Sequence, residues 1–283
     1  MEITDNSCSF SKCLSIAGFD SSGGAGLQAD IKTFSAWGCY GMTVLTALPI
    51  QNTMGVRNCY TIPTSSIQEQ LEAIFDDIRP DSIKIGMLFS KNIIRLVSKF
   101  IQCRAETIPI VTDPVMYAKS GNRLLEEDAV DALKNEIFPL STVITPNIPE
   151  ALLLTGLKES TEKHHIMESL IGITSCSVLL KGGHSNSDEC NSDECDDWLY
   201  HHKKKNISVL HGKRVQTKNT HGTGCTMSAA IASGLALGFD IPTSCEKAKQ
   251  YVYNAIIQAQ KNPIGKGAGP VHHFYNIWPN LTI

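Results

Sequence analysis

The residues with the clearest chemical potential lie in the stretch NTHGTGCTMSAAIASG, at positions 219–234. Gly222, Thr223 and Gly224 allow the backbone to turn sharply, so that successive N–H groups can point at one spot. A helical pattern rich in small residues follows, and the N-terminus of a helix favours negative charge at the same place. The stretch therefore predicts an anion hole suited to a phosphoryl group during its transfer. It does not have the P-loop pattern G-x-x-x-x-G-K-[ST].

A second glycine-rich stretch, SSGGAGLQADIKT, occupies positions 21–33, and its residues 24–29 fit the G-x-G-x-x-G/A pattern of dinucleotide-binding turns. That pattern also requires an acidic residue about 20 positions later, at the end of the second strand, to bind a ribose hydroxyl. Gln51 stands there instead, and residues 20–22 separate the glycines from the preceding strand. A nicotinamide cofactor is therefore disfavoured. The glycines serve either a tight turn without a ligand or a different ligand.

The elements that must position these loops follow a regular alternation up to residue 183. The expected strands are 13–19, 42–50, 82–88, 108–115, 141–146 and 176–183, and the expected helices are 26–38, 64–78, 91–103, 125–136, 148–155 and 161–173. Because the strands are continuous apolar runs with helices between them, the pattern predicts a parallel sheet covered on both faces.

The alternation breaks in the last hundred residues. Strand-like segments at 197–202, 207–210 and 212–218 are separated by turn-length gaps, which predicts a short antiparallel addition to the sheet. Two helices are expected after them, at 223–238 and 243–261. Gly238 suits the position just past the first helix, and Pro242 suits the start of the second.

Composition and charge exclude several classes of protein. The chain has 283 residues, a formal net charge of −3 and 42% hydrophobic residues, as expected for one globular domain. Its one basic run, at residues 203–205, is best explained as a solvated turn, so nucleic acid is not an expected partner. No apolar run approaches the ~18 residues of a membrane helix, and no membrane association is expected. Ten cysteines are too dilute for a disulfide scaffold, so we expect free thiols in the cytoplasm.

The expected organisation is a polar N-terminal tail at residues 1–12 and a single domain at 13–283. The segment NSDEC occurs twice in tandem, at 186–190 and 191–195, inside an acidic loop insertion at 185–197. A surface loop is the preferred interpretation. A metal site with His184, His201 and His202 is the alternative, although Cys-x4-Cys spacing is unusual for zinc and no second cysteine pair follows.

Several ordered motifs resemble those of known kinases. GTGC at 222–225 is similar to the anion-hole motif of ribokinase-like small-molecule kinases. Seven further stretches narrow the resemblance to the hydroxymethylpyrimidine kinase/hydroxymethylpyrimidine phosphate kinase family of thiamine biosynthesis, over residues 12–276: SIAGFDSSGGAGLQADIKTFSAWGCYG, QNTMGV, KIGML, DPVM with KSG, TPNIPEA, LLKGGH and GKGAGPVHHF.

This resemblance implies a ribokinase-like three-layer α/β/α fold, with a mainly parallel central sheet and a few antiparallel strands near the C-terminal half. It implies transfer of a phosphoryl group from ATP, with Mg²⁺, to 4-amino-5-hydroxymethyl-2-methylpyrimidine and then to its monophosphate. It also implies a homodimer. Because the chain ends soon after GPVHHF, no fused thiamine-phosphate synthase domain is expected.

The resemblance assigns the first glycine loop to the pyrimidine. It places Gln51 at the ring, where a side-chain amide offers a donor and an acceptor to a ring nitrogen beside an exocyclic amine. It places Asp30 near the hydroxymethyl group and Met87 against the flat ring. Gly18 and Pro49 complete the substrate-binding set.

Cys225 stands where many ribokinase-like kinases carry the aspartate that accepts the proton of the attacking hydroxyl. A thiol has a reference pKa of about 8.5, and a helix N-terminus can lower it, which would allow a thiolate to act as general base. The group could equally position the hydroxyl, since phosphoryl transfer depends more on charge stabilisation than on a base. We therefore expect a larger loss of rate from distorting residues 222–224 than from Cys225→Ser.

The resemblance assigns ATP and Mg²⁺ to residues nearer the C-terminal half. Asn147 and Glu150 match the N-x-x-E motif of the superfamily, in which Glu150 holds Mg²⁺ or its waters. Asp113, at the end of its strand, adds a second carboxylate of the kind that Mg²⁺ prefers. Three lysines complete the ATP-binding set: Lys181, Lys218 and Lys266.

Two other functions fit part of this pattern. Pyridoxal also carries a hydroxymethyl group on a flat nitrogen ring, and some pyridoxal kinases share the cysteine, but Gln51 with QNTMGV and KIGML favours the pyrimidine. A non-catalytic pyrimidine-binding regulator would belong to a different class. The intact GTGC motif with Asn147, Glu150 and Asp113 argues against it, because a sensor has no need of a phosphoryl site.

Overall fold

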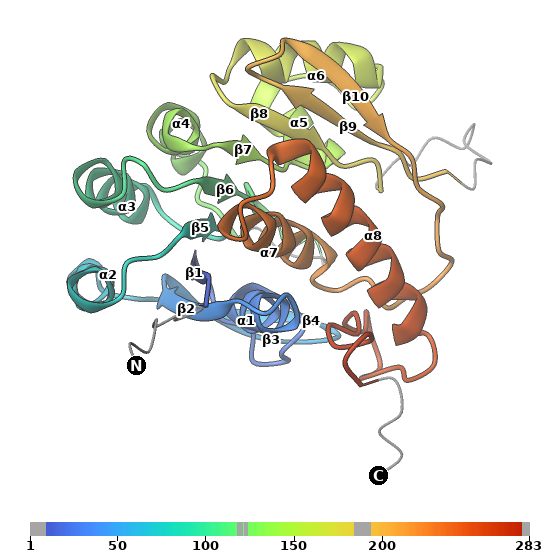
Figure 1. The fold of residues 1–283 in the computed structure, drawn as a ribbon, viewed down its shortest axis with the longest axis horizontal. Coiled ribbons are helices and arrows are strands. Elements are labelled where there is room, and N and C mark those ends of the chain that lie inside the picture. Colours follow the sequence, from blue (N-terminus) through green and yellow to red (C-terminus); the bar gives the residue numbers. More distant parts are fainter. Residues whose placement is uncertain (1–9, 118–120, 122–123, 184–193, 279–283) are drawn as a thin grey trace, which may run out of the picture.

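The computed structural model describes residues 10–117, 121, 124–183 and 194–278. Helices cover both faces of one large sheet, so that the described chain forms three layers (Figure 1). Within the described ranges, none of the helices combines the length and apolarity that crossing a bilayer requires. The three-layer α/β/α arrangement expected from the sequence is confirmed.

The large sheet has eight strands in the order β10-β9-β8-β7-β6-β5-β1-β2. All neighbours from β8 to β2 run parallel, whereas β9 pairs antiparallel with β8 and β10 pairs antiparallel with β9. The strands are β1 (Lys12–Ala17), β2 (Tyr40–Leu45), β5 (Ser82–Ile85), β6 (Ile110–Thr112), β7 (Val143–Ile144), β8 (Ser177–Leu180), β9 (Asp197–His201) and β10 (Asn206–Leu210). A parallel sheet with an antiparallel addition is therefore confirmed.

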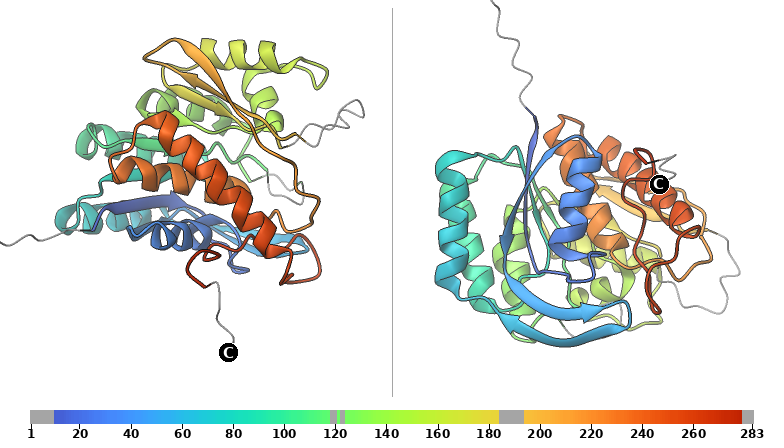
Figure 2. Two further views of the ribbon diagram at one scale, coloured as in Figure 1. Left: turned by 45° about the vertical axis from the view of Figure 1, so that its right-hand side comes forward. Right: turned by 90° about the horizontal axis from the view of Figure 1, so that it is seen from below.

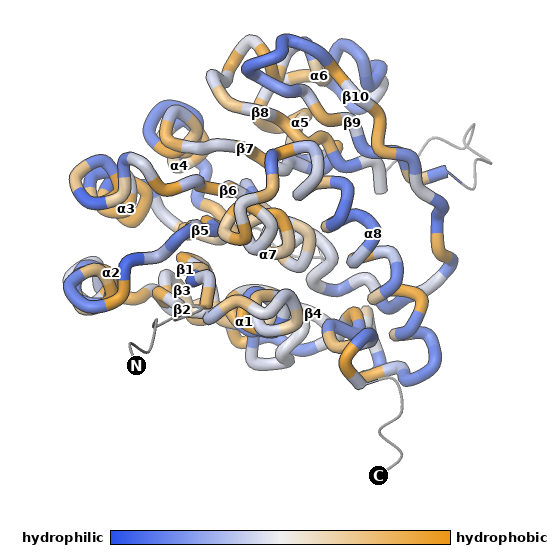
Figure 3. The backbone as a smooth tube through the Cα atoms, viewed as in Figure 1, coloured by the Kyte–Doolittle hydropathy of each residue, from blue (hydrophilic) through white to orange (hydrophobic). Residues whose placement is uncertain are grey.

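Two apolar cores lie on opposite faces of the sheet because alternate strand residues point to opposite sides. In β1, Leu14 and Ile16 join one core, and Cys13 joins the other. The first core packs against α2 (Thr64–Asp77), α3 (Lys91–Arg104), α4 (Ala129–Ala132), α5 (Ile148–Thr155) and α6 (Lys163–Gly172). The second packs against α1 (Gly26–Ala36), α7 (Thr223–Ala236) and α8 (Ile241–Ala259). Along α2 and α3 hydrophobic and hydrophilic residues alternate, as one buried face requires (Figure 3).

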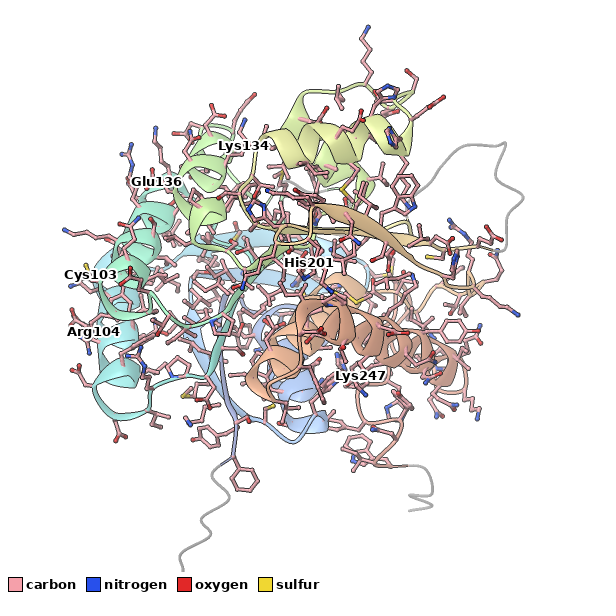
Figure 4. All side chains as sticks on the ribbon, turned by 45° about the horizontal axis from the view of Figure 1, so that its top comes forward. Cys103, Arg104, Lys134, Glu136, His201 and Lys247 are labelled. Carbon is pink, nitrogen blue, oxygen red and sulfur yellow. The ribbon has the colours of Figure 1, made fainter. Side chains whose placement is uncertain are left out.

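Charged side chains join the outer helices to one another. Arg104, which points outward from α3 in Figure 4, donates to Oδ1 of Asp76 in α2 at 2.8 Å. Nε of Arg95 lies 3.4 Å from Oε1 of Glu136. Such exposed pairs contribute little to stability, so the packing of the two cores holds the layers together.

The expected strand 42–50 is confirmed only up to Leu45, where β2 ends and the chain leaves the large sheet. Residues Ala47–Asn52 form β3, which pairs antiparallel with β4 (Gly55–Thr61) in a separate two-stranded sheet that curves away from the helical layers (Figure 2). The break occurs at Thr46, whose hydroxyl donates to the carbonyl of Met87. Pro49 also lacks the N–H that a strand in a larger sheet would donate.

Two other expected elements differ from the structure. Residues 212–218 form no strand, and their only pairing among the described residues is a single bridge between Lys213 and Glu194. The expected helix 125–136 is reduced to α4, followed by a π-helical turn (Leu133–Ile137) and a 3-10 turn (Phe138–Leu140). Pro139 in that last turn cannot donate the hydrogen bond that would continue an α-helix.

The signals at the two C-terminal helices are confirmed. Gly238 follows α7 with φ of +85°, a conformation that suits glycine. Pro242 lies in the first turn of α8, which begins at Ile241 because the side chain of Asp240 accepts from the N–H of Thr243 at 2.9 Å. Most of the NSDEC repeat, His184 and most of the N-terminal tail lie outside the described residues. In the part that is described, no group of three or more potential metal ligands is found.

Candidate active site

A cavity of about 1360 Å³ lies at the carboxyl ends of the parallel strands. In open α/β sheets this edge is where ligands bind. The cavity is lined by twelve residues singled out from the sequence: Gly18, Pro49, Gln51, Met87, Asp113, Asn147, Glu150, Lys181, Gly222, Thr223, Gly224 and Cys225. The topology thus gathers residues from seven separate stretches of sequence into one place.

The predicted anion-hole loop forms the start of α7. Gly222 is the residue before the helix and has φ of +78°. A Cβ atom at this position would overlap the carbonyl oxygen of Gly24 in the first glycine loop. The two glycine loops therefore touch each other, and Gly222 is required both for its conformation and for this approach. The N–H groups at the start of a helix have no partner inside it and can face an anion; in this loop that of Thr223 makes a long contact of 3.4 Å with the carbonyl of Thr220.

Two carboxylates and a lysine face one another at the ends of β6, β7 and β8. Nζ of Lys181 lies 2.9 Å from Oδ1 of Asp113, and both side chains are largely buried. Burial opposes charge on Lys181, but Asp113 and Glu150 outweigh it and raise the pKa of the lysine. Burial also raises the pKa of Glu150 to about 7, with Lys181 opposing the shift. The group combines hard oxygen donors with a fixed cation.

Asn147 and Glu150 have a structural role as well as a place in the cavity. The side chain of Asn147 accepts from the N–H of Glu150, and Oε2 of Glu150 accepts from the N–H of Asn147, both at 2.9 Å. This reciprocal pair is the capping box that begins α5. The helix cap and the side chains facing the cavity are therefore the same two residues.

Asp30 is more deeply buried than its place on a helix suggests. It has no exposed surface and does not reach the cavity wall. Its Oδ2 lies 2.8 Å from Nζ of Lys84 and accepts from the hydroxyl of Ser15. Its Oδ1 is buried and has no hydrogen-bond partner among the described residues. Lys84 gives no signal in the sequence, yet it is one of the residues around the cavity, at the floor of which its side chain lies buried.

Of the two roles left open for Cys225, the structure does not favour that of a base with a lowered pKa. Burial raises the pKa of Cys225 to about 11, and the opposing effect of Lys84 is smaller. Asp30 and Asp113 raise it further, because a thiolate would add negative charge beside two carboxylates. At neutral pH the side chain is a thiol, which can donate a hydrogen bond but accepts a proton poorly.

Lys218 and Lys266 are not brought to the cavity wall, and their assignment to ATP stays a prediction. The segment that holds Lys266 packs on the β3–β4 turn instead, where Gly267 and Ala268 donate from their N–H groups to Thr53 at 3.3 and 3.0 Å. Three other lysines line the cavity: Lys213, Lys247 and Lys249. Lys247 and Lys249 stand two positions apart in α8, a spacing that places them on different sides of a helix and gives no sequence signal.

The sequence model of the phosphomethylpyrimidine kinase family matches residues 20–272 of this chain. The hydroxymethylpyrimidine/phosphomethylpyrimidine kinase of Escherichia coli is 41% identical over 268 residues, which cover 94% of this chain and 98% of that protein. The thiamine biosynthesis bifunctional protein ThiED of Geobacter sulfurreducens is 43% identical, covering 92% of this chain and 51% of that one. The structure of Bacillus subtilis pyridoxal kinase in an ADP complex superposes with a TM-score of 0.83 at 36% identity, covering 94% of this chain and 98% of that chain.

Proposed function

This chain belongs to the phosphomethylpyrimidine kinase family, and from that membership we infer that it is a kinase of thiamine biosynthesis. It transfers the γ-phosphoryl group of ATP to 4-amino-5-hydroxymethyl-2-methylpyrimidine and then a second one to the resulting monophosphate. The observation that carries this function is the anion hole at residues 222–224, which opens into the same cavity as Lys181 and two carboxylates. That combination stabilises the charge of a phosphoryl group during transfer.

The pyrimidine lies on the side of the cavity formed by the β1–α1 loop, β3 and the end of β5. The Gln51 amide provides the donor and acceptor that an aminopyrimidine edge requires. Met87 packs on the ring, and the absence of a side chain at Gly18 leaves room for it, because a Cβ at Gly18 would lie 2.9 Å from the Met87 sulfur. Pro49 lines the same side. The assignment of Asp30 to the substrate side stays a prediction, because its carboxylate is buried and does not reach the cavity wall.

Mg²⁺ is held by Asp113 and Glu150, which supply the oxygen ligands that this ion prefers. The fit is supported by their shared place in the cavity and by Lys181 beside them. When bound, Mg²⁺ neutralises charge on the ATP phosphates. Lys181 neutralises further charge, and Asn147 keeps Glu150 oriented through the capping box.

The two steps place different demands on Cys225. In the first, the hydroxymethyl oxygen attacks the γ-phosphorus, the bond from that phosphorus to the leaving oxygen of ADP breaks, and the hydroxyl proton passes to an oxygen of the transferred phosphoryl group and then to solvent. In the second, an ionised phosphate oxygen attacks and needs no base. Because the thiol is protonated at neutral pH, we assign Cys225 to positioning the attacking oxygen by hydrogen bonding rather than to accepting its proton.

Two finer features are also proposed. Tyr40, Ile50, Met54 and Tyr60 expose large apolar side chains on β2 and on the β3–β4 hairpin, and a second copy of the chain is the proposed partner that covers them. Sedimentation velocity would then show a dimer.

All eight cysteines within the described ranges are free thiols, which supports the proposed cytoplasmic location.

The function is tested by incubating the protein with MgATP and either hydroxymethylpyrimidine or pyridoxal, and resolving the products by mass. Pyrimidine diphosphate is the expected product. Phosphorylated pyridoxal without pyrimidine diphosphate would contradict it and would favour the second candidate, pyridoxal kinase, which the superposition on the Bacillus subtilis enzyme supports. A Gln51→Leu variant sharpens the test, since its kcat/KM should fall more for the pyrimidine than for pyridoxal.

A further inference from the structure

Asp20 follows β1 and organises the first glycine loop from inside. Its side chain is completely buried. Oδ1 accepts from the N–H and the hydroxyl of Ser22 at 2.9 and 2.7 Å. Oδ2 accepts from the N–H groups of Gly24 and Ala25 at 3.0 and 2.7 Å. One carboxylate thus fixes the path of the loop that precedes α1.

The same carboxylate reaches the anion-hole loop. Nε2 of His221, one residue before Gly222, lies 2.8 Å from Oδ2 of Asp20, although 201 positions separate the two residues. Burial raises the pKa of Asp20, but hydrogen bonds from His221 and Ser22 outweigh it and lower the pKa to about 2. The carboxylate is therefore ionised at neutral pH and only accepts hydrogen bonds. It follows that Nε2 of His221 carries a proton.

The backbones around this pair leave no room for adjustment. A Cβ at Gly24 would lie 2.5 Å from Cδ2 of His221. The backbone N–H of His221 donates to the carbonyl of Gly269 at 3.0 Å, which fixes the backbone that carries the ring. His221 is thus fixed between the segments that contain Gly24 and Gly269. A change in the length of its side chain would therefore move one glycine loop relative to the other.

We propose that Asp20 and His221 are a positioning pair, which sets the distance between the pyrimidine bound by the first glycine loop and the phosphoryl group bound by the anion hole. This inference rests on the proposed function. The first loop also holds the hairpin that carries Gln51, because the hydroxyl of Ser21 donates to the Gln51 carbonyl at 2.8 Å. The pair therefore connects Gln51, which binds the pyrimidine ring in the proposed function, to the N–H groups that bind the phosphoryl group.

A matched pair of substitutions at His221 separates position from mere packing. His221→Gln extends an amide N–H to the place of Nε2, whereas His221→Asn is too short to reach Asp20. We expect kcat for His221→Asn to fall about 100-fold, the effect of a misplacement of about 1 Å. The KM values for the pyrimidine and for ATP should change less than about threefold, because the loss concerns the transition state. His221→Gln should recover at least about tenfold of the lost kcat.

Asp20→Asn tests the other partner. Each oxygen of the carboxylate accepts at least two hydrogen bonds, so an amide in either orientation turns its NH₂ group toward N–H donors. The kcat should fall as in His221→Asn. In the double variant the two losses should not add, since both remove the same connection.

Tyr251→Phe is the control for lost stability alone. It removes a buried hydrogen bond of 2.6 Å to the carbonyl of His273, and Tyr251 lies outside the cavity wall. Its melting temperature should fall with kcat unchanged. The proposal is overturned if His221→Asn loses no more kcat than Tyr251→Phe, if His221→Gln is no better than His221→Asn, or if the Asp20 and His221 losses add. Failure of the wild-type protein to phosphorylate the pyrimidine would instead refute the proposed function.

Discussion

The Nζ atom of Lys84 lies 2.8 Å from Oδ2 of Asp30, and neither side chain has any exposed surface. The pair joins the central strand β5 to α1 beneath the cavity. Burial opposes charge on Lys84, but the carboxylates of Asp30 and Asp113 outweigh it and raise the pKa of the lysine. A positive charge is thereby held at the floor of the cavity, close to Asp113.

Replacing Lys84 should destabilise the fold strongly. Lys84→Met leaves the carboxylate of Asp30 buried without its counter-ion, and breaking a buried pair in this way costs about 3–5 kcal/mol. Urea unfolding monitored by circular dichroism measures the loss. The double variant Lys84→Met with Asp30→Leu should recover much of the stability while staying inactive. If Lys84→Met alone were as stable as wild type, Lys84 would not be the counter-ion that the buried Asp30 carboxylate requires.

Gly222→Ala should abolish most of the turnover. The alanine would have to adopt φ of +78° and its Cβ would overlap the carbonyl of Gly24, so the anion-hole N–H groups must move. Loss of one such donor costs about 100- to 1,000-fold in kcat. Cys225→Ser should cost less than about tenfold, because hydroxyl and thiol can both position the attacking oxygen. Steady-state kinetics on purified variants compares the two.

Gly238→Ala is the matched control for this comparison. Gly238 also has positive φ, +85°, but no heavy atom lies within 4 Å of a Cβ built there. The Gly238→Ala substitution should therefore lower the melting temperature through backbone strain alone, with kcat preserved. Equal losses of kcat at the two glycines would mean that strain, rather than the position of the anion hole, explains the effect at Gly222.

The alternating elements could be predicted because their signals are local. Apolar strand runs and helical periodicity located all six parallel strands of the large sheet, and the small residues around Gly222 predicted the start of α7. The break between β2 and β3 could not be predicted in this way. It depends on Thr46, whose hydroxyl bonds to the carbonyl of Met87, 41 positions later, and sequence periodicity carries no trace of such a contact.

The residues of the candidate site could be predicted where they belong to a short motif. They could not be predicted where their role depends on a partner far away in the sequence. GTGC and N-x-x-E identify short segments, and the structure brings both to the cavity. Lys84 and His221 are missed because each is paired with a carboxylate 54 or 201 positions away. The direction of the Cys225 pKa shift could not be predicted either, because the helix N-terminus is visible in the sequence whereas the burial and the neighbouring carboxylates are not.

The protonated thiol predicts equal effects on the two phosphorylations. With a pKa raised to about 11, Cys225 cannot act as an efficient base at pH 7. Cys225→Ala should then slow transfer to the hydroxymethyl group and transfer to the monophosphate by the same factor. Single-turnover rates measured separately with the two substrates test this. A loss confined to the first step would restore the base role.

The pKa of Glu150 predicts a stability that depends on pH in the absence of divalent cations. Burial raises the pKa of this carboxyl from 4.5 to about 7. Between these values the unfolded chain has released the proton while the folded chain still holds it. The free energy of unfolding must therefore fall as the pH rises, and above about pH 7 the loss is complete.

Glu150→Gln removes the titration but keeps the oxygen that caps α5. Urea unfolding in EDTA at pH 5, 6, 7 and 8 should therefore show wild type losing about 2–3 kcal/mol relative to Glu150→Gln across this range, since each pKa unit corresponds to about 1.4 kcal/mol. Parallel curves for the two proteins would show that Glu150 ionises normally in the folded state.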